Sequence, residues 1–156
     1  MKLLFICTHN RCRSILAEAV TNHYGANSLI AKSAGSQPVG AVHPLSLKYL
    51  SQAGIAIDNL CSQSWHEHEN WQPDVVITVC DSAAAESCPV WFGDAVKVHW
   101  PLQDPSSQEG SEDDIAQGFK HTITLLQSRI SKLLELDVAT KEPEQISQIF
   151  KQVGSL

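Results

Sequence analysis

Short apolar runs alternate with segments of helical periodicity along this 156-residue chain. Runs rich in branched apolar residues predict buried strands at residues 3–6, 28–33, 74–80 and 95–100. Apolar residues spaced three or four apart predict helices over residues 13–24, about 44–53, about 112–136 and about 142–153. Alternating strands and helices favour parallel pairing. The pattern therefore predicts an α/β fold with three layers, in which a central parallel four-stranded sheet carries helices on both faces.

The length suits one domain, residues 1–156, in which residues 137–156 form a C-terminal extension of unassigned role, with a peripheral last helix. The chain is 43% hydrophobic and 18% charged, and it holds no apolar run long enough to span a membrane. A net charge of -6 argues against non-specific binding to nucleic acid. Five cysteines without a predicted export signal indicate reduced thiols with catalytic or redox roles. We expect a cytoplasmic protein and a monomer.

The loop between the first predicted strand and the first predicted helix contains several residues with reactive or charged side chains. It runs from Cys7 to Ser14 as Cys-Thr-His-Asn-Arg-Cys-Arg-Ser. Backbone N–H groups in such a loop and in the first helical turn lack helical partners, and the helix dipole adds partial positive charge. This environment favours the thiolate of Cys7, and Arg13 can offer two parallel donors to a tetrahedral oxyanion. The sequence therefore predicts an oxyanion site with a nucleophile. The alternative is a buried structural cysteine beside a solvated arginine.

Cys7, five intervening residues, Arg13 and Ser14 directly after an N-terminal strand resemble the phosphate loop of low-molecular-weight protein tyrosine phosphatases and of their arsenate reductase relatives. The resemblance extends to residues 33–35, Ser-Ala-Gly, and covers roughly residues 1–135. It implies the low-molecular-weight phosphatase fold and an oxyanion substrate, arsenate or phosphate. The loop residues that would bind or support the oxyanion are Thr8, His9, Asn10, Arg11, Cys12 and Ser14.

Individual loop residues carry further expectations. Asn10 resembles the family's asparagine that holds the loop in a left-handed conformation, which asparagine tolerates. Ser14 can donate its hydroxyl to the Cys7 thiolate. His9 and Arg11 stand where relatives commonly carry small residues, so we expect their side chains to point outward.

Two further cysteines, Cys80 and Cys88, follow the third predicted strand. Because parallel strands end at the same edge of a sheet, we expect Cys80 to lie on the edge that holds Cys7. The segment resembles the redox segment of arsenate reductases, which implies that Cys7 attacks arsenate, Cys80 displaces arsenite and Cys88 resolves the disulfide. Thioredoxin would reduce the final Cys80–Cys88 disulfide, although some relatives use glutathione and glutaredoxin. The alternative interpretation, for each cysteine taken singly, is that Cys80 is a small apolar residue that ends a strand and that Cys88 is a loop thiol without a role.

Asp104, followed by Pro105, lies in a loop after the fourth predicted strand. The resemblance implies that it is the general acid that protonates the leaving oxygen. An ordinary Asp-Pro turn is the alternative interpretation. Phosphatases of this family usually carry an aromatic pair after that Asp-Pro, whereas Ser106 and Ser107 follow here.

The resemblance thus implies a thioredoxin-coupled arsenate reductase that serves arsenic detoxification and retains weak phosphatase activity. The alternative function is a low-molecular-weight protein tyrosine phosphatase that hydrolyses aryl phosphates through a phospho-Cys7 intermediate. A non-catalytic oxyanion-binding module is a third possibility, which the intact set of Cys7, Arg13 and Asp104 disfavours.

A potassium site is the only metal site that the resemblance suggests. Asn10, Ser14 and Glu18 match residues that help to bind potassium in some relatives. Those relatives use a further acidic residue in the segment that matches residues 61–68, where this chain has no aspartate. We therefore expect no metal and no tightly bound cofactor, and potassium bound at Asn10, Ser14 and Glu18 is the alternative.

The remaining unusual residues have simpler expected roles. Cys12 lies close enough to Cys7 in sequence to form a protective disulfide under oxidation, and Cys61 fills space or faces solvent. His66 and His68, which lie among glutamates, are expected in a solvated loop. The aromatic residues expected to pack beside the sheet edge are Trp91, Phe92 and Trp100.

Overall fold

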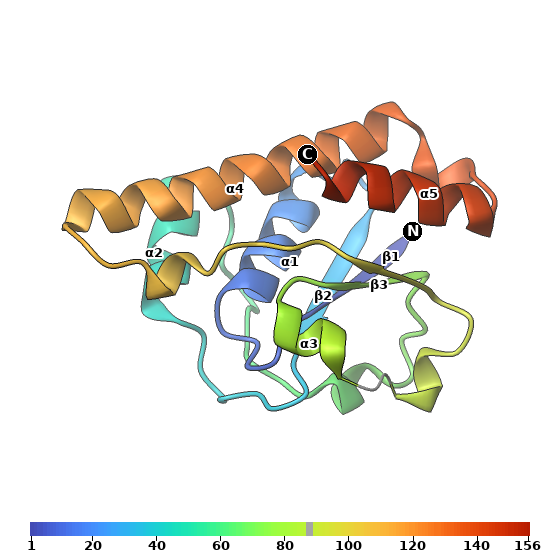
Figure 1. Ribbon diagram of the computed structural model, residues 1–156, viewed down its shortest axis with the longest axis horizontal. Helices are drawn as coiled ribbons and strands as arrows, with labels where there is room; N and C mark the ends of the chain where they lie inside the picture. The colour runs from blue at the N-terminus through green and yellow to red at the C-terminus, as the bar shows by residue number, and fades with distance from the viewer. Residues whose placement is uncertain (87–88) are drawn as a thin grey trace.

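The computed structural model describes residues 1–86 and 89–156, apart from the side chain of Trp91. Within these residues, the centre is a parallel sheet of four strands in the order β2-β1-β3-β4 (Figure 1). The strands are β1 (Lys2–Ile6), β2 (Ile30–Ala34), β3 (Val75–Thr78) and β4 (Val96–His99). The parallel pairing and the α/β alternation confirm the fold predicted from the sequence.

All four strands have bounds that differ from the predicted ones by one or two residues. The apolar run predicts β3 over residues 74–80, but the strand ends at Thr78 because its partner β1 ends at Ile6, which is paired with Thr78. β2 begins at Ile30 because Lys2, the first residue of β1, is paired there. β4 in turn pairs residue by residue with the four residues of β3. The length of each strand is set by the neighbouring strand with which it pairs, so the apolar pattern of one segment alone does not predict where that strand ends.

The helices in the described residues surround this sheet. They are α1 (Arg13–Tyr24), α2 (Pro44–Gln52), α3 (Asp81–Ala85), α4 (Glu112–Glu135) and α5 (Pro143–Gly154), with 3-10 helices at Trp65–His68, Val90–Phe92, Pro105–Ser107 and Val138–Thr140. The predicted helices correspond to α1, α2, α4 and α5. Among the described residues, none of the helices combines the length and the apolarity that a membrane span needs.

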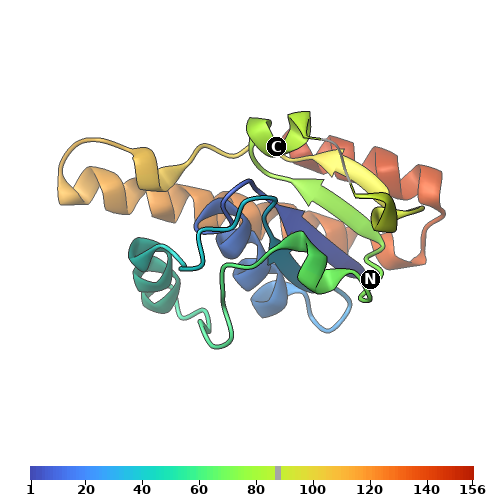
Figure 2. The ribbon, with the colours of Figure 1, turned by 90° about the horizontal axis from the view of Figure 1, so that it is seen from below.

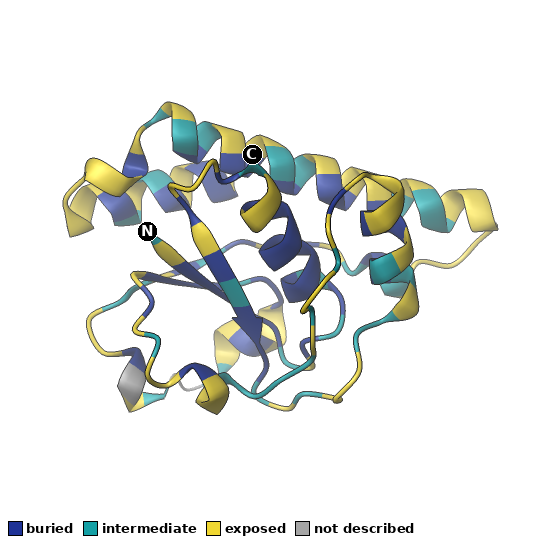
Figure 3. Ribbon diagram, turned by 180° about the vertical axis from the view of Figure 1, so that it is seen from behind, coloured by how far each residue is buried: buried dark blue, intermediate teal, exposed yellow. Residues whose placement is uncertain are grey.

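Helix α1 is the most deeply buried helix and positions the loop that precedes it. It packs against β1 and β2 on one side and against α4 on the other. Residues 14–21 are therefore buried without interruption, which Figure 3 shows as a dark blue helix next to the strands. On the other face of the sheet, the edge of the Trp65 ring meets the Phe92 ring with centroids 5.8 Å apart, so the 3-10 helices supply part of the cover there.

The C-terminal extension belongs to the core, which corrects the expectation of a peripheral helix. Helix α5 packs on β4 and runs beside α4 (Figure 1). The Phe150 ring stacks on Trp100 with centroids 5.6 Å apart, and both residues are fully buried. The Trp100 indole also donates a hydrogen bond of 2.8 Å to the Phe150 carbonyl oxygen. The large apolar surface of Trp100 needs a cover on this side of the sheet, and α5 provides it.

The carboxyl ends of the parallel strands define one edge of the sheet. Figure 2 shows the arrows of β1 and β3 pointing toward the same side, with α3 beyond the tip of β3. Because Ile6 and Thr78 are paired, Cys7 and Cys80 follow strand ends that lie next to each other. The expectation that both cysteines share one edge is confirmed, and it is the edge at which open parallel sheets bind ligands.

Candidate active site

The loop from Cys7 to Arg13 is held in shape by the side chain of Asn10. Asn10 adopts a left-handed backbone conformation with φ of 49°, as the sequence predicts. Its amide nitrogen Nδ2 donates to the hydroxyl oxygens of Ser14 at 2.8 Å and Ser33 at 3.0 Å. Its Oδ1 accepts a hydrogen bond of 2.9 Å from the backbone N–H of Gln63. One fully buried side chain therefore ties the loop to α1, to β2 and to the segment before the first 3-10 helix.

The Ser14 hydroxyl is directed at the Cys7 sulfur. The two atoms are 2.9 Å apart, and both residues are buried. Because the Ser14 oxygen already accepts a hydrogen bond from Asn10, its own proton is free to be donated to the sulfur. Such a donor stabilises a thiolate more than a neutral thiol.

The backbone of the Ser-Ala-Gly segment supports the loop from the side of β2. Gly35 lies so close that an added Cβ would be 2.5 Å from the carbonyl oxygen of Thr8. The Thr8 carbonyl accepts a hydrogen bond of 2.9 Å from Gln37 N–H, and Cys7 N–H donates to the Ala34 carbonyl at 3.3 Å. The need for this close approach explains the glycine at position 35.

Arg13 and Asp104 face each other across the site. Arg13 Nη2 lies 3.9 Å from Asp104 Oδ2, and Arg13 Nη1 donates to the Leu102 carbonyl at 3.3 Å. The other carboxylate oxygen, Oδ1, accepts from Ser106 twice, from its backbone N–H at 3.0 Å and its hydroxyl at 2.6 Å. Both charged side chains remain partly exposed, at 24% for Arg13 and 31% for Asp104. Ser106 thus fixes the carboxylate so that Oδ2 is the oxygen turned toward the arginine.

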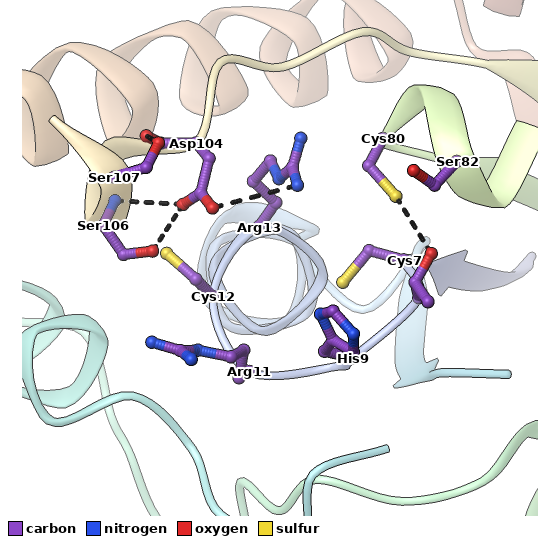
Figure 4. Close-up of a pocket in the computed structure, with 11 residues that line it drawn as sticks. Cys7, His9, Arg11, Cys12, Arg13, Cys80, Ser82, Asp104, Ser106 and Ser107 are labelled. Carbon is purple, nitrogen blue, oxygen red and sulfur yellow. Dashed lines mark hydrogen bonds and ion pairs between the residues drawn. The ribbon is translucent and has the colours of Figure 1, made fainter. Parts of the chain in front are cut away.

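These groups line one cavity of about 310 Å³ at the carboxyl edge of the sheet (Figure 4). The residues that line it are Cys7, Thr8, His9, Arg11, Cys12, Arg13, Cys80, Ser82, Asp104, Ser106 and Ser107. The structure therefore brings together most of the predicted site, while Asn10 and Ser14 support the loop from behind. His9 is exposed as expected, but both His9 and Arg11 belong to the wall of the cavity. Cys88 lies outside the described residues.

Cys80 occupies the side of the cavity next to α3. It is buried and forms the N-cap of this short helix, where its sulfur accepts a hydrogen bond of 3.4 Å from Ala83 N–H. The same sulfur lies 3.8 Å from the hydroxyl oxygen of Thr8, the contact drawn as the dashed line from Cys80 in Figure 4. A second thiol therefore lies in the wall of the cavity, in contact with Thr8, the residue that follows Cys7 in the loop.

Cys12 is a third thiol in the cavity wall, but it is turned away from Cys7. Its sulfur points toward Ser106 in Figure 4. Burial raises the pKa of the Cys12 thiol to about 11, so it is neutral at ordinary pH. A disulfide between Cys12 and Cys7 stays a prediction. Cys61 is exposed, as expected, and lines a different pocket.

Glu18 and His68 line a second pocket behind the loop, near the residues that the resemblance associates with potassium, and potassium binding there stays a prediction. A cation of this type needs several free oxygen ligands. Asn10 Oδ1 is already bonded to Gln63, and the Ser33 carbonyl lies 3.0 Å from His68 Nε2. Among the described residues, no group of three or more histidine, cysteine, aspartate or glutamate side chains could hold a metal. Burial raises the pKa of Glu18 to about 7, so its carboxyl group is only partly ionised at neutral pH.

The burial of His68 corrects a prediction. The sequence places His66 and His68 together in a solvated loop, and His66 is indeed exposed. His68 is buried, and burial lowers the pKa of its ring. The 3-10 helix over Trp65–His68 turns this ring toward the backbone of Ser33, a contact that the charged neighbours in the sequence conceal. Trp100 and Phe92 are buried, as expected.

Some residues of the site carry no signal in the sequence. Glu86 accepts a hydrogen bond of 3.1 Å from the Thr8 hydroxyl, although 78 residues separate the two. Ser82 and Ser107 line the cavity through the fold of α3 and of the 3-10 helix Pro105–Ser107. Only Ser106, two residues after the predicted acid, has a recognisable pattern, because a residue at that spacing can bond to an aspartate side chain in a turn.

Residues 2–146 match the family of low molecular weight phosphotyrosine protein phosphatases. The match spans most of the chain and includes the Cys7 loop, Cys80 and Asp104. The chain therefore belongs to the low molecular weight phosphotyrosine protein phosphatase family.

Within that family the chain is similar to curated arsenate reductases. It is 31% identical to the arsenate reductase of Shouchella clausii over 133 residues, which cover 85% of this chain and 94% of the relative. It is 36% identical to the arsenate reductase of Staphylococcus xylosus over 110 residues, which cover 70% of this chain and 82% of the relative.

Solved structures of arsenate reductases have the same fold. One arsenate reductase, in the phosphate binding state, superimposes with a TM-score of 0.70 at 26% identity, covering 86% of this chain and 97% of that one. The thioredoxin-dependent arsenate reductase of Corynebacterium glutamicum gives a TM-score of 0.67 at 28% identity, covering 90% of this chain and 63% of that one.

Proposed function

We propose that this protein is an arsenate reductase that converts arsenate to arsenite. The observation that carries the proposal is the second thiol, Cys80, in the wall of the cavity that contains Cys7. Hydrolysis of a phosphate ester at Cys7 needs no such thiol, whereas reduction needs a group that gives up electrons. The arsenate reductases among the relatives support the same reaction.

In the first step, the oxyanion lies in the loop with its oxygens toward the backbone N–H groups and the Arg13 guanidinium. The Cys7 sulfur, which accepts a hydrogen bond from the Ser14 hydroxyl with Sγ and Oγ 2.9 Å apart, attacks arsenic and forms the S–As bond. An oxygen of arsenate leaves as water. Asp104 supplies its proton as general acid, a role supported by its position in the wall of the cavity that holds Cys7 and Arg13.

In the second step, Cys80 attacks the Cys7 sulfur. An S–S bond forms as the S–As bond breaks, and the bonding electron pair stays on arsenic. Arsenic passes from As(V) to As(III) while the two sulfurs are oxidised. The adjacent strand ends and the shared cavity of Cys7 and Cys80 support this step.

In the third step, Cys88 would attack Cys80 and release Cys7, which leaves a Cys80–Cys88 disulfide for the reductant. We propose thioredoxin as that reductant, because one similar structure is a thioredoxin-dependent arsenate reductase. Glutathione with glutaredoxin is the alternative reductant. Either system is typical of the cytoplasm, where we place the protein.

Phosphatase activity is the second candidate function. The family membership and the pairing of Arg13 with Asp104 favour hydrolysis of small aryl phosphates through phospho-Cys7. Ser106 and Ser107 line the cavity where the resemblance predicts aromatic side chains that grip a phenyl ring. We therefore propose a weak phosphatase activity beside the reduction of arsenate.

The test is arsenate-dependent oxidation of NADPH in the presence of thioredoxin and thioredoxin reductase, on the wild type and on Cys88→Ser. Turnover that disappears in the variant supports the relay and the reductant together. Turnover only with glutathione and glutaredoxin would change the reductant. Hydrolysis of an aryl phosphate without any reduction of arsenate would refute the proposal in favour of the phosphatase.

A further inference from the structure

We propose that Glu86 takes up, through the Thr8 hydroxyl, the proton that Cys80 loses when it attacks the Cys7–arsenic adduct. This inference rests on the proposed reduction of arsenate and assigns a positioning residue to its second step. The reaction requires such a proton acceptor because an ordinary cysteine thiol is mostly protonated at neutral pH, and only the thiolate attacks efficiently.

Three side chains from separate parts of the chain form a continuous hydrogen-bonded line. Cys80 Sγ lies 3.8 Å from Thr8 Oγ1, and Thr8 Oγ1 lies 3.1 Å from Glu86 Oε1. Thr8 follows Cys7 directly in the loop, so this line ends beside the reacting sulfur. Glu86 is partly buried and follows α3 by one residue.

The chemistry of the three groups fixes the direction in which the protons point. An ionised carboxylate can only accept, so Thr8 must donate its hydroxyl proton to Glu86. The Thr8 oxygen is then free to accept from Cys80, while the Cys80 sulfur accepts from Ala83 N–H at 3.4 Å. The thiol proton of Cys80 is thereby directed at Thr8, and a path from thiol to carboxylate exists before arsenate binds.

The proton and electron balance of the step is complete with these groups. The Cys80 proton passes to Thr8 Oγ1 as the Thr8 proton passes to Glu86 Oε1. The Cys80 sulfur bonds to the Cys7 sulfur, and the Cys7–As bond breaks with its electron pair on arsenic. Glu86 then returns its proton to solvent or to the departing arsenite.

The experiment measures arsenite formed in the first turnover, in the absence of any reductant, by rapid quenching from pH 6 to pH 9. It compares the fully reduced wild type with Glu86→Gln, which keeps the size of the side chain and removes the proton acceptor. Asp81→Asn is the matched control. It removes a carboxylate from α3 that is 97% exposed and bonded to His99, not to Thr8.

We expect Glu86→Gln to form arsenite about a hundredfold more slowly than the wild type at pH 7. The deficit should shrink as pH rises, because hydroxide then removes the thiol proton directly. Glu86→Asp should restore part of the rate at pH 7, and Asp81→Asn should react like the wild type.

Two results would overturn the inference while leaving the proposed function intact. One is a wild-type rate in Glu86→Gln. The other is a deficit of the same factor at every pH, which would mean that Glu86 only holds the segment in place. Absence of arsenite from the wild type would instead refute the proposed function, and the inference would fall with it.

Discussion

Removal of the Ser14 hydroxyl should weaken every reaction that begins at Cys7. This hydroxyl is fully buried, accepts from Asn10 at 2.8 Å and lies 2.9 Å from the Cys7 sulfur. Ser14→Ala deletes one hydrogen bond to a charged sulfur, worth about 1.5–3 kcal/mol. The same free energy in the transition state corresponds to a loss of about 10- to 150-fold in rate.

The assay is kcat/KM for hydrolysis of a small aryl phosphate, which reports the attack of Cys7 without any contribution from the reductant. Ser46→Ala is the matched control, because Ser46 is also fully buried and its hydroxyl reaches the same loop at the Arg11 carbonyl, away from Cys7. We expect Ser46→Ala to stay close to the wild type. A kcat/KM for Ser14→Ala within about twofold of the wild type would refute the assigned direction of the Ser14 hydrogen bond.

Three further substitutions test the support of the site and the core. Gly35→Ala should cost most of the arsenate and aryl phosphate activity, because its Cβ would press on the Thr8 carbonyl at 2.5 Å; a fully active variant in either assay would contradict the packing. Phe150→Ala should lower the free energy of unfolding in urea by about 3–5 kcal/mol, because it removes the ring that stacks on Trp100. A change below about 1 kcal/mol would contradict the assignment of α5 to the core. Burial raises the pKa of Glu18 in the folded state to about 7, above its ordinary 4.5, so Glu18 loses its proton in the unfolded state first as pH rises. The free energy of unfolding should therefore fall by about 3 kcal/mol between about pH 5 and about pH 7. Glu18→Gln should remove that fall in pH-dependent urea unfolding, and an unchanged slope would contradict the assignment.

The parts of the fold that local pattern predicts are those governed by local physics. The apolar run at residues 3–6, the loop from Cys7 and the start of α1 at Arg13 follow from strand and helix periodicity in neighbouring residues. The joint placement of Cys7 and Cys80 needed only one further rule, that parallel strands end at one edge. The nucleophile, the arginine and the second thiol could therefore be located before the structure.

The features that the sequence does not reveal depend on contacts between distant segments. β3 stops at Thr78 because its partner stops, and His68 is buried because a 3-10 helix turns it toward β2. Helix α5 is part of the core because it covers Trp100, 50 residues before Phe150. The bond between Thr8 and Glu86 likewise joins two loops whose sequences carry no mutual signal.

The central claim is that Cys7 and Cys80 together reduce arsenate. The most direct measurement mixes arsenate with fully reduced Cys88→Ser protein, without thioredoxin, and then determines arsenite and maps disulfides by mass spectrometry. The account predicts arsenite in an amount equal to the protein, with a disulfide between Cys7 and Cys80. Absence of arsenite, or a disulfide that joins Cys7 to Cys12 instead, would contradict it.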